Sequence, residues 1–469
     1  MNLSKIHSVY FLGIGGIGMS ALARYFNAMG KRVAGYDKTR TYLTDELMAE
    51  GIQIHFEDHI RNIPAFIKEL PYDIDNILIV FTPAVPKDHS EYVFFNLNGF
   101  NIKKRAEVLG MITQTGHTIA VAGTHGKTTT SSLIAHVLKS AGLDPSAFLG
   151  GITQNYNTNL LLSKQLKVEH VASDNKHLII VEADEYDRSF LTLHPEIAVI
   201  TSVDADHLDI YGDAGQVEES FSLFAKQVKS KLILKKNIVS KVFVDGITTF
   251  SYAVNDEAAD YFAQNIRIEN GLYVYDIITP STVFKNITLG LPGIHNVENS
   301  IAAVAVACQL NVSEKVIGES LSSFKGVRRR FDYHIKTDAL VYIDDYAHHP
   351  EELNASISSA KEMYPGKKIT GIFQPHLFSR TRDFADDFAR SLDLLDECIL
   401  MEIYPARELP ITGVNSQMLL DKMKLPNKCI CQKENLLKEL ASRNLEVLMT
   451  MGAGDIDTFI EPIKKQLIK

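Results

Sequence analysis

Short runs of apolar residues alternate with stretches of helical periodicity along almost the whole chain. The runs at 178–181 and 197–200 are typical, because each is rich in Ile and Val and gives way to polar residues. Strands of this kind, separated by helices, indicate parallel sheets and an α/β fold. A chain of 469 residues is long enough for about three domains, which we place at 1–110, 111–325 and 326–469.

The first block opens with a strand, a glycine-rich loop and a helix. An apolar run at 7–13 is followed by glycines up to residue 18, a helical stretch at 21–30, and a second apolar run that ends at Asp37. In the Rossmann fingerprint such glycines let the backbone approach a diphosphate, and the distal acid binds a ribose hydroxyl. We therefore expect a nucleotide diphosphate here, without a distinction between NAD and other such ligands. A further strand ends near Thr82, at the sheet edge where ligands bind.

A second glycine loop, at 123–128, lies between an apolar run and a long helical stretch that stops at Gly142. Its glycines, the helix N-terminus and Lys127 can cradle phosphate oxygens, and the Thr128 hydroxyl can bind Mg²⁺. The common phosphate-loop pattern has a glycine where this chain has Val121. The context of strand and helix still predicts a site for ATP or GTP, acting on the terminal phosphate.

Acidic residues follow the next two apolar runs of this block. Glu182 ends the run at 178–181, and a carboxylate beside a phosphate loop is the usual partner of the metal ion or its water. His207 lies among acids after the run at 197–200. It suits a second divalent ion or a charged phosphate, but a local hydrogen-bonding role explains it equally well.

Several other polar positions could have either a structural or a ligand-binding role. Asn296 and Asn299 share one helix face, where they could read an adenine edge, although Asn296 could simply cap the helix. The arginines at 328–330 could be a solvated run or a phosphate clamp. The loops at 346–350 and 374–382 are rich in donors and follow apolar runs, so ribose or substrate contacts are expected there.

Composition narrows the function. The net charge is −9 and no long basic run occurs, which argues against nucleic acid as a main partner. The longest apolar stretch, near 301–308, is too short to cross a membrane. Four cysteines show neither a disulfide framework nor zinc-ligand spacing, which favours reduced thiols. We therefore expect a cytoplasmic protein without membrane insertion, and a monomer or weak homodimer.

Ordered motifs over the whole chain resemble those of the Mur ligases. They are GIGGIGMS, RAEVLG, GTHGKTTT, EADEYDRSFLTLHP, DADHLD, HNVENSIAA, RRRFDYH, DDYAHHP, QPHLFSRTRD, EIYPARELPITGVNS and MGAGDI. The resemblance implies an N-terminal Rossmann-like domain for a UDP sugar, a central phosphate-loop ATPase domain and a C-terminal Rossmann-like domain. It is strongest to the branch that joins L-alanine to UDP-N-acetylmuramate through an acyl phosphate, with ATP and two Mg²⁺ ions.

The resemblance also implies roles for individual residues. The UDP sugar would be bound by Gly15, Gly16, Ile17, Gly18, Ser20, Asp37 and Thr82. ATP would be bound by Gly123, Thr124, His125, Gly126, Lys127, Thr128, Thr129, Asn296, Asn299 and Asp345. The metal ligands would be Thr128, Glu182 and His207, and Lys127, Glu182, His207 and Arg330 would be catalytic. L-Alanine would lie near Tyr346, His376 and Arg380.

Two departures from family patterns bear on the branch. Several Mur ligases carry a carbamylated lysine at the position of Ser222, which leaves the ligand set of the second metal incomplete but agrees with the alanine-adding branch. The motif EADEYD has a tyrosine where many alanine-adding enzymes have serine, as in murein peptide ligases, which attach a recycled tripeptide. That tripeptide ligase is the main alternative. An NAD-dependent oxidoreductase and a non-catalytic nucleotide sensor explain fewer of the motifs.

Overall fold

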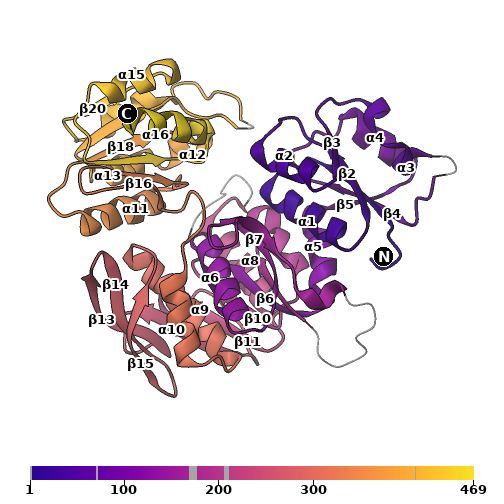
Figure 1. The fold of residues 1–469 in the computed structure, drawn as a ribbon, viewed down its shortest axis with the longest axis horizontal. Coiled ribbons are helices and arrows are strands. Elements are labelled where there is room, and N and C mark those ends of the chain that lie inside the picture. Colours follow the sequence, from indigo (N-terminus) through magenta and orange to yellow (C-terminus); the bar gives the residue numbers. More distant parts are fainter. Residues whose placement is uncertain (1–2, 70–71, 168–176, 205–210, 407, 469) are drawn as a thin grey trace. The chain divides into compact units, whose positions relative to one another are not determined.

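The computed structural model (Figure 1) describes residues 3–69, 72–167, 177–204, 211–406 and 408–468. The chain folds into two compact units. The first comprises Met1–Asn265, Tyr275–Ile287 and Glu298–Phe324, and the second comprises Ile266–Val274, Thr288–Val297 and Lys325–Lys469.

The N-terminal part of the first unit is a parallel five-stranded sheet. Its strand order is β3 (Gln53–His55), β2 (Arg32–Tyr36), β1 (Ser8–Leu12), β4 (Ile77–Phe81) and β5 (Asn101–Lys104). The helices are α1 (Ile17–Ala28), α2 (Tyr42–Ala49), α3 (Ala65–Lys68), α4 (Ser90–Leu97) and α5 (Arg105–Thr113). The order reverses between β1 and β4, which is where a doubly wound sheet binds nucleotides. The predicted Rossmann-like domain is confirmed.

A ten-stranded sheet follows along the chain. Its order is β15 (Val283–Leu289), β14 (Leu272–Ile278), β13 (Tyr261–Glu269), β12 (Thr248–Val254), β11 (Lys231–Lys235), β10 (Ile197–Ile200), β6 (His117–Ala122), β9 (Leu178–Glu182), β7 (Ser146–Thr153) and β8 (Thr158–Leu161). The associated helices are α6 (Lys127–Ser140), α8 (Ala214–Ala225), α9 (Ile294–Gln309) and α10 (Glu314–Ser323). Helix α6 packs on β6, β7 and β9. Parallel β9, β6 and β10 are adjacent, so the predicted site loops leave one edge of this sheet together.

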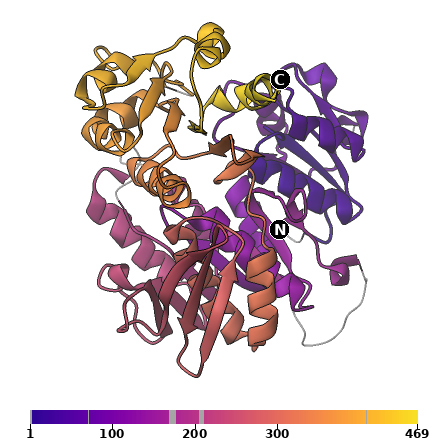
Figure 2. The same ribbon diagram turned by 60° about the vertical axis from the view of Figure 1, so that its left-hand side comes forward.

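The second unit contains a six-stranded sheet. Its order is β16 (Asp332–Lys336), β17 (Val341–Asp345), β21 (Val447–Met451), β18 (Ile369–Phe373), β19 (Glu397–Leu400) and β20 (Lys428–Ile430), with β16 antiparallel to β17. The helices are α11 (Pro350–Met363), α12 (Phe378–Asp383), α13 (Ala385–Leu392), α14 (Ser416–Lys422), α15 (Leu436–Ala441) and α16 (Ile460–Leu467). Figure 2 shows this part in orange and yellow.

The C-terminal sheet is buried on both faces. Val341 and Ile343 pack into one hydrophobic cluster with α11, α13 and α14, whereas Tyr342 between them packs into another with α15 and α16. Because successive side chains of a strand point to opposite faces, two covered faces require a continuous apolar run. This explains why the sequence shows apolar runs rather than alternation.

All four cysteines are free thiols, as the absence of a disulfide pattern in the sequence suggested. They are Cys308, Cys398, Cys429 and Cys431. Burial raises the pKa of each thiol, and it raises that of Cys308 to about 11. In the described part of the chain, none of the helices combines the length and the apolar character needed to cross a bilayer.

Candidate active site

The loop between β6 and α6 can be built only with glycine at two positions. Gly123 and Gly126 have φ angles of +135° and +81°, in the region that side chains rarely adopt. A Cβ at Gly123 would lie 2.1 Å from Thr201 Oγ1, and one at Gly126 would lie 2.8 Å from Asn299 Oδ1. Helix α6 begins directly afterwards at Lys127, so its free N–H groups face the loop and favour an anion.

Side chains at the end of β10 hold this loop in place. The Thr124 and Ser202 hydroxyls are 2.8 Å apart, and the His125 N–H donates to Ser202 Oγ at 2.8 Å. Thr128 and Thr129 are 7% and 8% exposed at the start of the helix. These contacts fix the loop against the end of β10.

Lys127 lies in a buried ion pair. Its ammonium contacts the Glu185 carboxylate at 2.8 Å and donates to the Gly123 carbonyl at 2.6 Å. Burial raises the pKa of Glu185 to about 7. Burial by itself would lower the pKa of Lys127, but the carboxylates around it, with Glu185 foremost, outweigh this and raise it. The ammonium is therefore charged where ATP phosphates are predicted.

Glu182 ends β9 beside the phosphate loop, because it pairs in register with Val121 of β6. Its carboxylate accepts the Gly150 N–H at 3.1 Å, and a Cβ at Gly150 would lie 2.2 Å from Glu182 Oε2. His207, the other predicted metal ligand, lies outside the described residues. Among the residues that are described, no three His, Cys, Asp or Glu side chains gather as a metal site.

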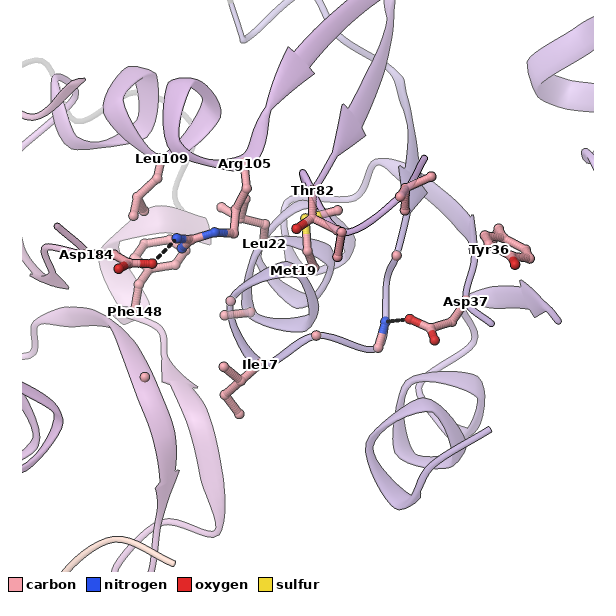
Figure 3. A pocket seen from close by; sticks show the side chains of 18 of the residues that line it. Ile17, Met19, Leu22, Tyr36, Asp37, Thr82, Arg105, Leu109, Phe148 and Asp184 are labelled. Atoms are coloured by element: carbon pink, nitrogen blue, oxygen red, sulfur yellow. Dashed lines mark hydrogen bonds and ion pairs between the residues drawn. The ribbon is translucent and has the colours of Figure 1, made fainter. Parts of the chain in front are cut away.

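A pocket of about 630 Å³ lies within the first unit, a size typical of small-molecule sites. Figure 3 shows it between the glycine loop that precedes α1 and a wall that includes Phe148 and Asp184. The predicted residues that line it are Gly15, Gly16, Ile17, Gly18, Asp37 and Thr82. Ser20 does not line it. Its side chain is fully buried, donates to the Ile17 carbonyl at 2.9 Å and contacts Asn159.

Asp37 shapes the glycine loop of this pocket. Its Oδ2 accepts the Gly15 N–H at 2.7 Å (Figure 3). Its Oδ1 accepts the Thr39 N–H at 3.0 Å. A Cβ at Gly15 would lie 2.9 Å from the same Oδ2. The acid at the end of β2 therefore sets the conformation of the loop where a diphosphate is expected, and each oxygen keeps further acceptor capacity for a ribose hydroxyl.

Arg105, which the sequence reasoning did not single out, lies in the same pocket. Its Nη2 contacts Asp184 Oδ2 at 3.0 Å (Figure 3). A Cβ at Gly18 would lie 2.8 Å from Arg105 Nη1, so the guanidinium lies against the glycine loop. The motif RAEVLG contains this arginine, but only the fold shows that it faces the pocket.

Asn299 and Asn296 occupy different surroundings on α9. Asn299 lies against the phosphate loop through its contact with Gly126, and its Oδ1 accepts the Thr130 hydroxyl at 3.2 Å. The Asn296 amide donates to the Pro292 carbonyl at 2.6 Å, at the N-terminus of the helix. The capping alternative is wrong, because α9 begins at Ile294, two residues before Asn296, and because a capping side chain accepts a backbone N–H whereas this amide donates.

In the second unit, Asp345 ends β17 as a buried hydrogen-bond acceptor. It receives the Phe331 N–H at 3.1 Å, the Ala347 N–H at 2.9 Å and the Ser356 hydroxyl at 2.9 Å. Burial raises the pKa of Asp345 to about 6. Arg330 reaches Glu352 at 3.5 Å. Both predicted residues therefore hold the segment around β17, and their predicted contacts with ATP remain predictions.

The predicted amino-acid residues gather at the carboxyl ends of β17 and β18. The ring of His376 stacks on Tyr404, which sequence reasoning missed, with centroids 5.8 Å apart, and lies 6.0 Å from the ring of His348. Tyr346 contacts His348 at 5.1 Å. Burial lowers the pKa of His348 to about 4, and the nearby Arg380 acts in the same direction. These side chains form a cluster of aromatic rings that carry polar atoms, and the lowered pKa favours a neutral imidazole at His348.

Comparisons with known proteins match the chain over its full length. Three family models match the chain: "Mur ligase family, catalytic domain" at residues 8–117, "Mur ligase middle domain" at 121–307 and "Mur ligase, glutamate ligase domain" at 329–454. A UDP-N-acetylmuramate–L-alanine ligase of Flavobacterium johnsoniae is 52% identical, over 100% of this chain and 99% of its own.

Solved structures agree in fold. The UDP-N-acetylmuramate-alanine ligase of Thermotoga maritima has a TM-score of 0.81 and 27% identity, covering 98% of this chain and 99% of its own. A murein peptide ligase of Psychrobacter arcticus has a TM-score of 0.71 but 21% identity, covering 98% of both chains. At that identity the second match bears on the fold alone.

Proposed function

Because this chain belongs to the Mur ligase family, we propose that its phosphate loop and the neighbouring pocket bind the two nucleotides of one ligation, ATP and UDP-N-acetylmuramate. The reaction joins L-alanine to the lactyl carboxylate of the sugar nucleotide and forms ADP and phosphate. The assignment rests on one observation, the 52% identity over the full length to a relative named for this reaction. The tripeptide-adding alternative has weaker support, because two solved structures of such ligases are only 21% and 24% identical to this chain.

In the proposed first step, a lactyl carboxylate oxygen attacks the γ-phosphorus of ATP and ADP leaves. Lys127 and the N–H groups at the start of α6 stabilise the negative charge on the transferring phosphoryl group. The product is an acyl phosphate. In the second step the amine of L-alanine attacks the acyl carbon, loses a proton, and the tetrahedral intermediate expels inorganic phosphate to leave the amide.

The residues present fit Mg²⁺, which prefers carboxylate and hydroxyl oxygens. Thr128 at the start of α6 and Glu182 at the end of β9 supply such oxygens from adjacent strand ends. His207 is the proposed ligand of a second ion. Bound Mg²⁺ would neutralise phosphate charge, while Gly150 N–H keeps the Glu182 carboxylate in place.

The pocket has two distinct ends. One includes Asp184, and the other includes Tyr36 and Asp37 (Figure 3). Glu182, two residues before Asp184, ends β9 next to β6, the strand that leads into the phosphate loop, and His89 packs on Tyr36. The lactyl carboxylate must meet the γ-phosphate, so we place the muramyl group at the Glu182 end. The diphosphate then lies over the glycine loop and the uridine lies at the Tyr36 end.

Arg105 provides a test of this placement. We expect Arg105→Met to raise the KM for UDP-N-acetylmuramate at least about tenfold, because an arginine contact with a diphosphate or carboxylate is charge-assisted, and to leave the KM for ATP within about threefold. The neighbouring Lys104, which pairs with Asp187 at 3.0 Å, gives the control Lys104→Met. Initial rates of phosphate release over a range of each substrate measure both constants. An unchanged KM for the sugar nucleotide would remove Arg105 from the binding site.

The remaining predicted residues have the following proposed roles. Tyr346, His376 and Arg380 hold L-alanine, and Arg330 and Asp345 contact the phosphates and ribose of ATP. Asn296 and Asn299 are proposed to contact adenine. We place the reaction in the cytoplasm, with the protein as a monomer or weak homodimer.

The experiment that tests the function measures phosphate release from ATP and Mg²⁺ with UDP-N-acetylmuramate. The acceptors to compare are L-alanine and L-alanyl-γ-D-glutamyl-diaminopimelate. We expect turnover with L-alanine and none without an acceptor. Turnover with the tripeptide alone would assign the chain to the alternative ligation.

A further inference from the structure

His89 lies at the uridine end of the pocket, directly before helix α4 (Ser90–Leu97). Its side chain is 5% exposed and belongs to the pocket lining together with Tyr36, Asp37 and Lys38. Its ring packs on Tyr36, with centroids 4.4 Å apart. A buried histidine that borders a pocket is placed to contact a ligand rather than solvent.

Asp58 lies beside one nitrogen of His89. Its Oδ1 lies 3.3 Å from His89 Nδ1, and the Ser90 N–H fixes the same carboxylate at 3.1 Å. Neither ring nitrogen has a hydrogen-bond partner among the residues that the structure describes. Because a nearby carboxylate favours a proton on Nδ1, Nε2 is the nitrogen left to accept a hydrogen bond from a ligand.

The wall behind His89 is rigid. The Tyr10 hydroxyl donates to Glu91 Oε2 at 2.6 Å and lies 2.7 Å from His55 Nε2. Glu91 is fully buried in the first turn of α4, one residue beyond Ser90. Burial also lowers the pKa of His89, which favours the neutral ring. The ring is therefore held in one place by the residues around it.

We propose that His89 selects uracil over cytosine by accepting the N3–H of the base at Nε2. Uracil carries a proton on N3, whereas N3 of cytosine is itself an acceptor, so cytosine would set two lone pairs against each other. A buried polar group left unpaired discriminates strongly between otherwise similar ligands. The inference rests on the proposed function, because the placement of UDP-N-acetylmuramate in the pocket puts the base beside His89.

The test measures the affinities of UDP and CDP for the full-length protein by calorimetry. We expect the wild-type protein to bind UDP at least about tenfold more tightly than CDP. His89→Leu keeps the apolar bulk but removes the acceptor, so UDP affinity should fall at least about tenfold while CDP affinity does not fall. The control is His59→Gln, because His59 is exposed on the neighbouring loop, and it should leave both affinities unchanged.

A modified ligand tests the same contact without a mutation. Wild-type protein should bind UDP with a methyl group on N3 at least about tenfold more weakly than UDP. Equal binding of that ligand, or undiminished selectivity for UDP in a folded His89→Leu protein, would overturn the inference. Neither result would affect the proposed function, which fails separately if wild-type protein shows no turnover with UDP-N-acetylmuramate and L-alanine.

Discussion

Lys127→Met is expected to lower kcat about a thousandfold, because the variant loses the positive charge that stabilises the negative charge on the transferring phosphoryl group. The ammonium is buried and charged, and it lies 2.8 Å from Glu185 at the start of α6. A methionine of similar length fills the space but stabilises no charge. Phosphate release with saturating UDP-N-acetylmuramate and L-alanine measures the loss, and Lys139→Met, in the last turn of the same helix, is the control.

The stability of the Lys127 variants can be measured separately from their activity, because Lys127 also forms an ion pair with Glu185. Lys127→Met removes the ammonium that pairs with the buried Glu185 carboxylate, and we expect the free energy of unfolding to fall by about 1–3 kcal/mol. The cost is limited because burial already raises the pKa of Glu185 to about 7, so the carboxyl can take up a proton. The double variant with Glu185→Gln should regain stability but not activity. A kcat within tenfold of wild type in either variant would exclude the proposed role of Lys127.

Glu182→Gln is expected to lower kcat/KM for ATP at least about a hundredfold at millimolar Mg²⁺. The amide can still accept the Gly150 N–H that now lies 3.1 Å from Oε2, so the backbone around β9 is unchanged. It lacks the negative charge that a divalent ion prefers. A Mg²⁺ titration of phosphate release should show a higher half-saturating concentration in the variant.

Gly150→Ala tests the Glu182 carboxylate by displacing it instead of removing its charge. The added Cβ would lie 2.2 Å from Glu182 Oε2, so the carboxylate must move while its charge remains. We expect a loss of activity together with a raised Mg²⁺ requirement. Gly318→Ala is a suitable control, because the added Cβ would lie 3.4 Å from its nearest neighbouring atom. Gly142→Ala is a poor control, because the φ of Gly142 is +77°. Wild-type Mg²⁺ dependence in Glu182→Gln would rule out Glu182 as a metal ligand.

The sequence was sufficient for the fold class because the parallel strands are buried on both faces. The continuous apolar runs at 178–181 and 197–200 became strands, and β17 and β21 show why, since their side chains enter clusters on both sides of the sheet. The strands β12 to β15, by contrast, were not anticipated. Polar residues such as the exposed Asn265 and the half-buried Asp276 interrupt these strands, so the apolar runs are weaker. The domain limits at 110 and 325 remain predictions.

Site residues could be predicted from the sequence where their placement depends on residues next to them along the chain. The phosphate loop is an example, because Gly126 and Lys127 are set by a turn into a helix. Arg105 and Asp184 meet only through the fold, across a separation of 79 residues, and no local pattern announces such a contact. Ser20 illustrates the reverse, since a position on α1 that looked available to a ligand is fully buried. His207 lies outside the described residues.

The state of the cysteines has a practical consequence for fluorescence studies. A thiol reacts with maleimide dyes as the thiolate, and burial raises the pKa of Cys308, Cys398, Cys429 and Cys431 above the ordinary value. A single cysteine introduced at an exposed position, such as Leu97 at 79% exposure, would therefore react first at neutral pH. A dye can report on one chosen surface of the native chain without prior removal of its own thiols.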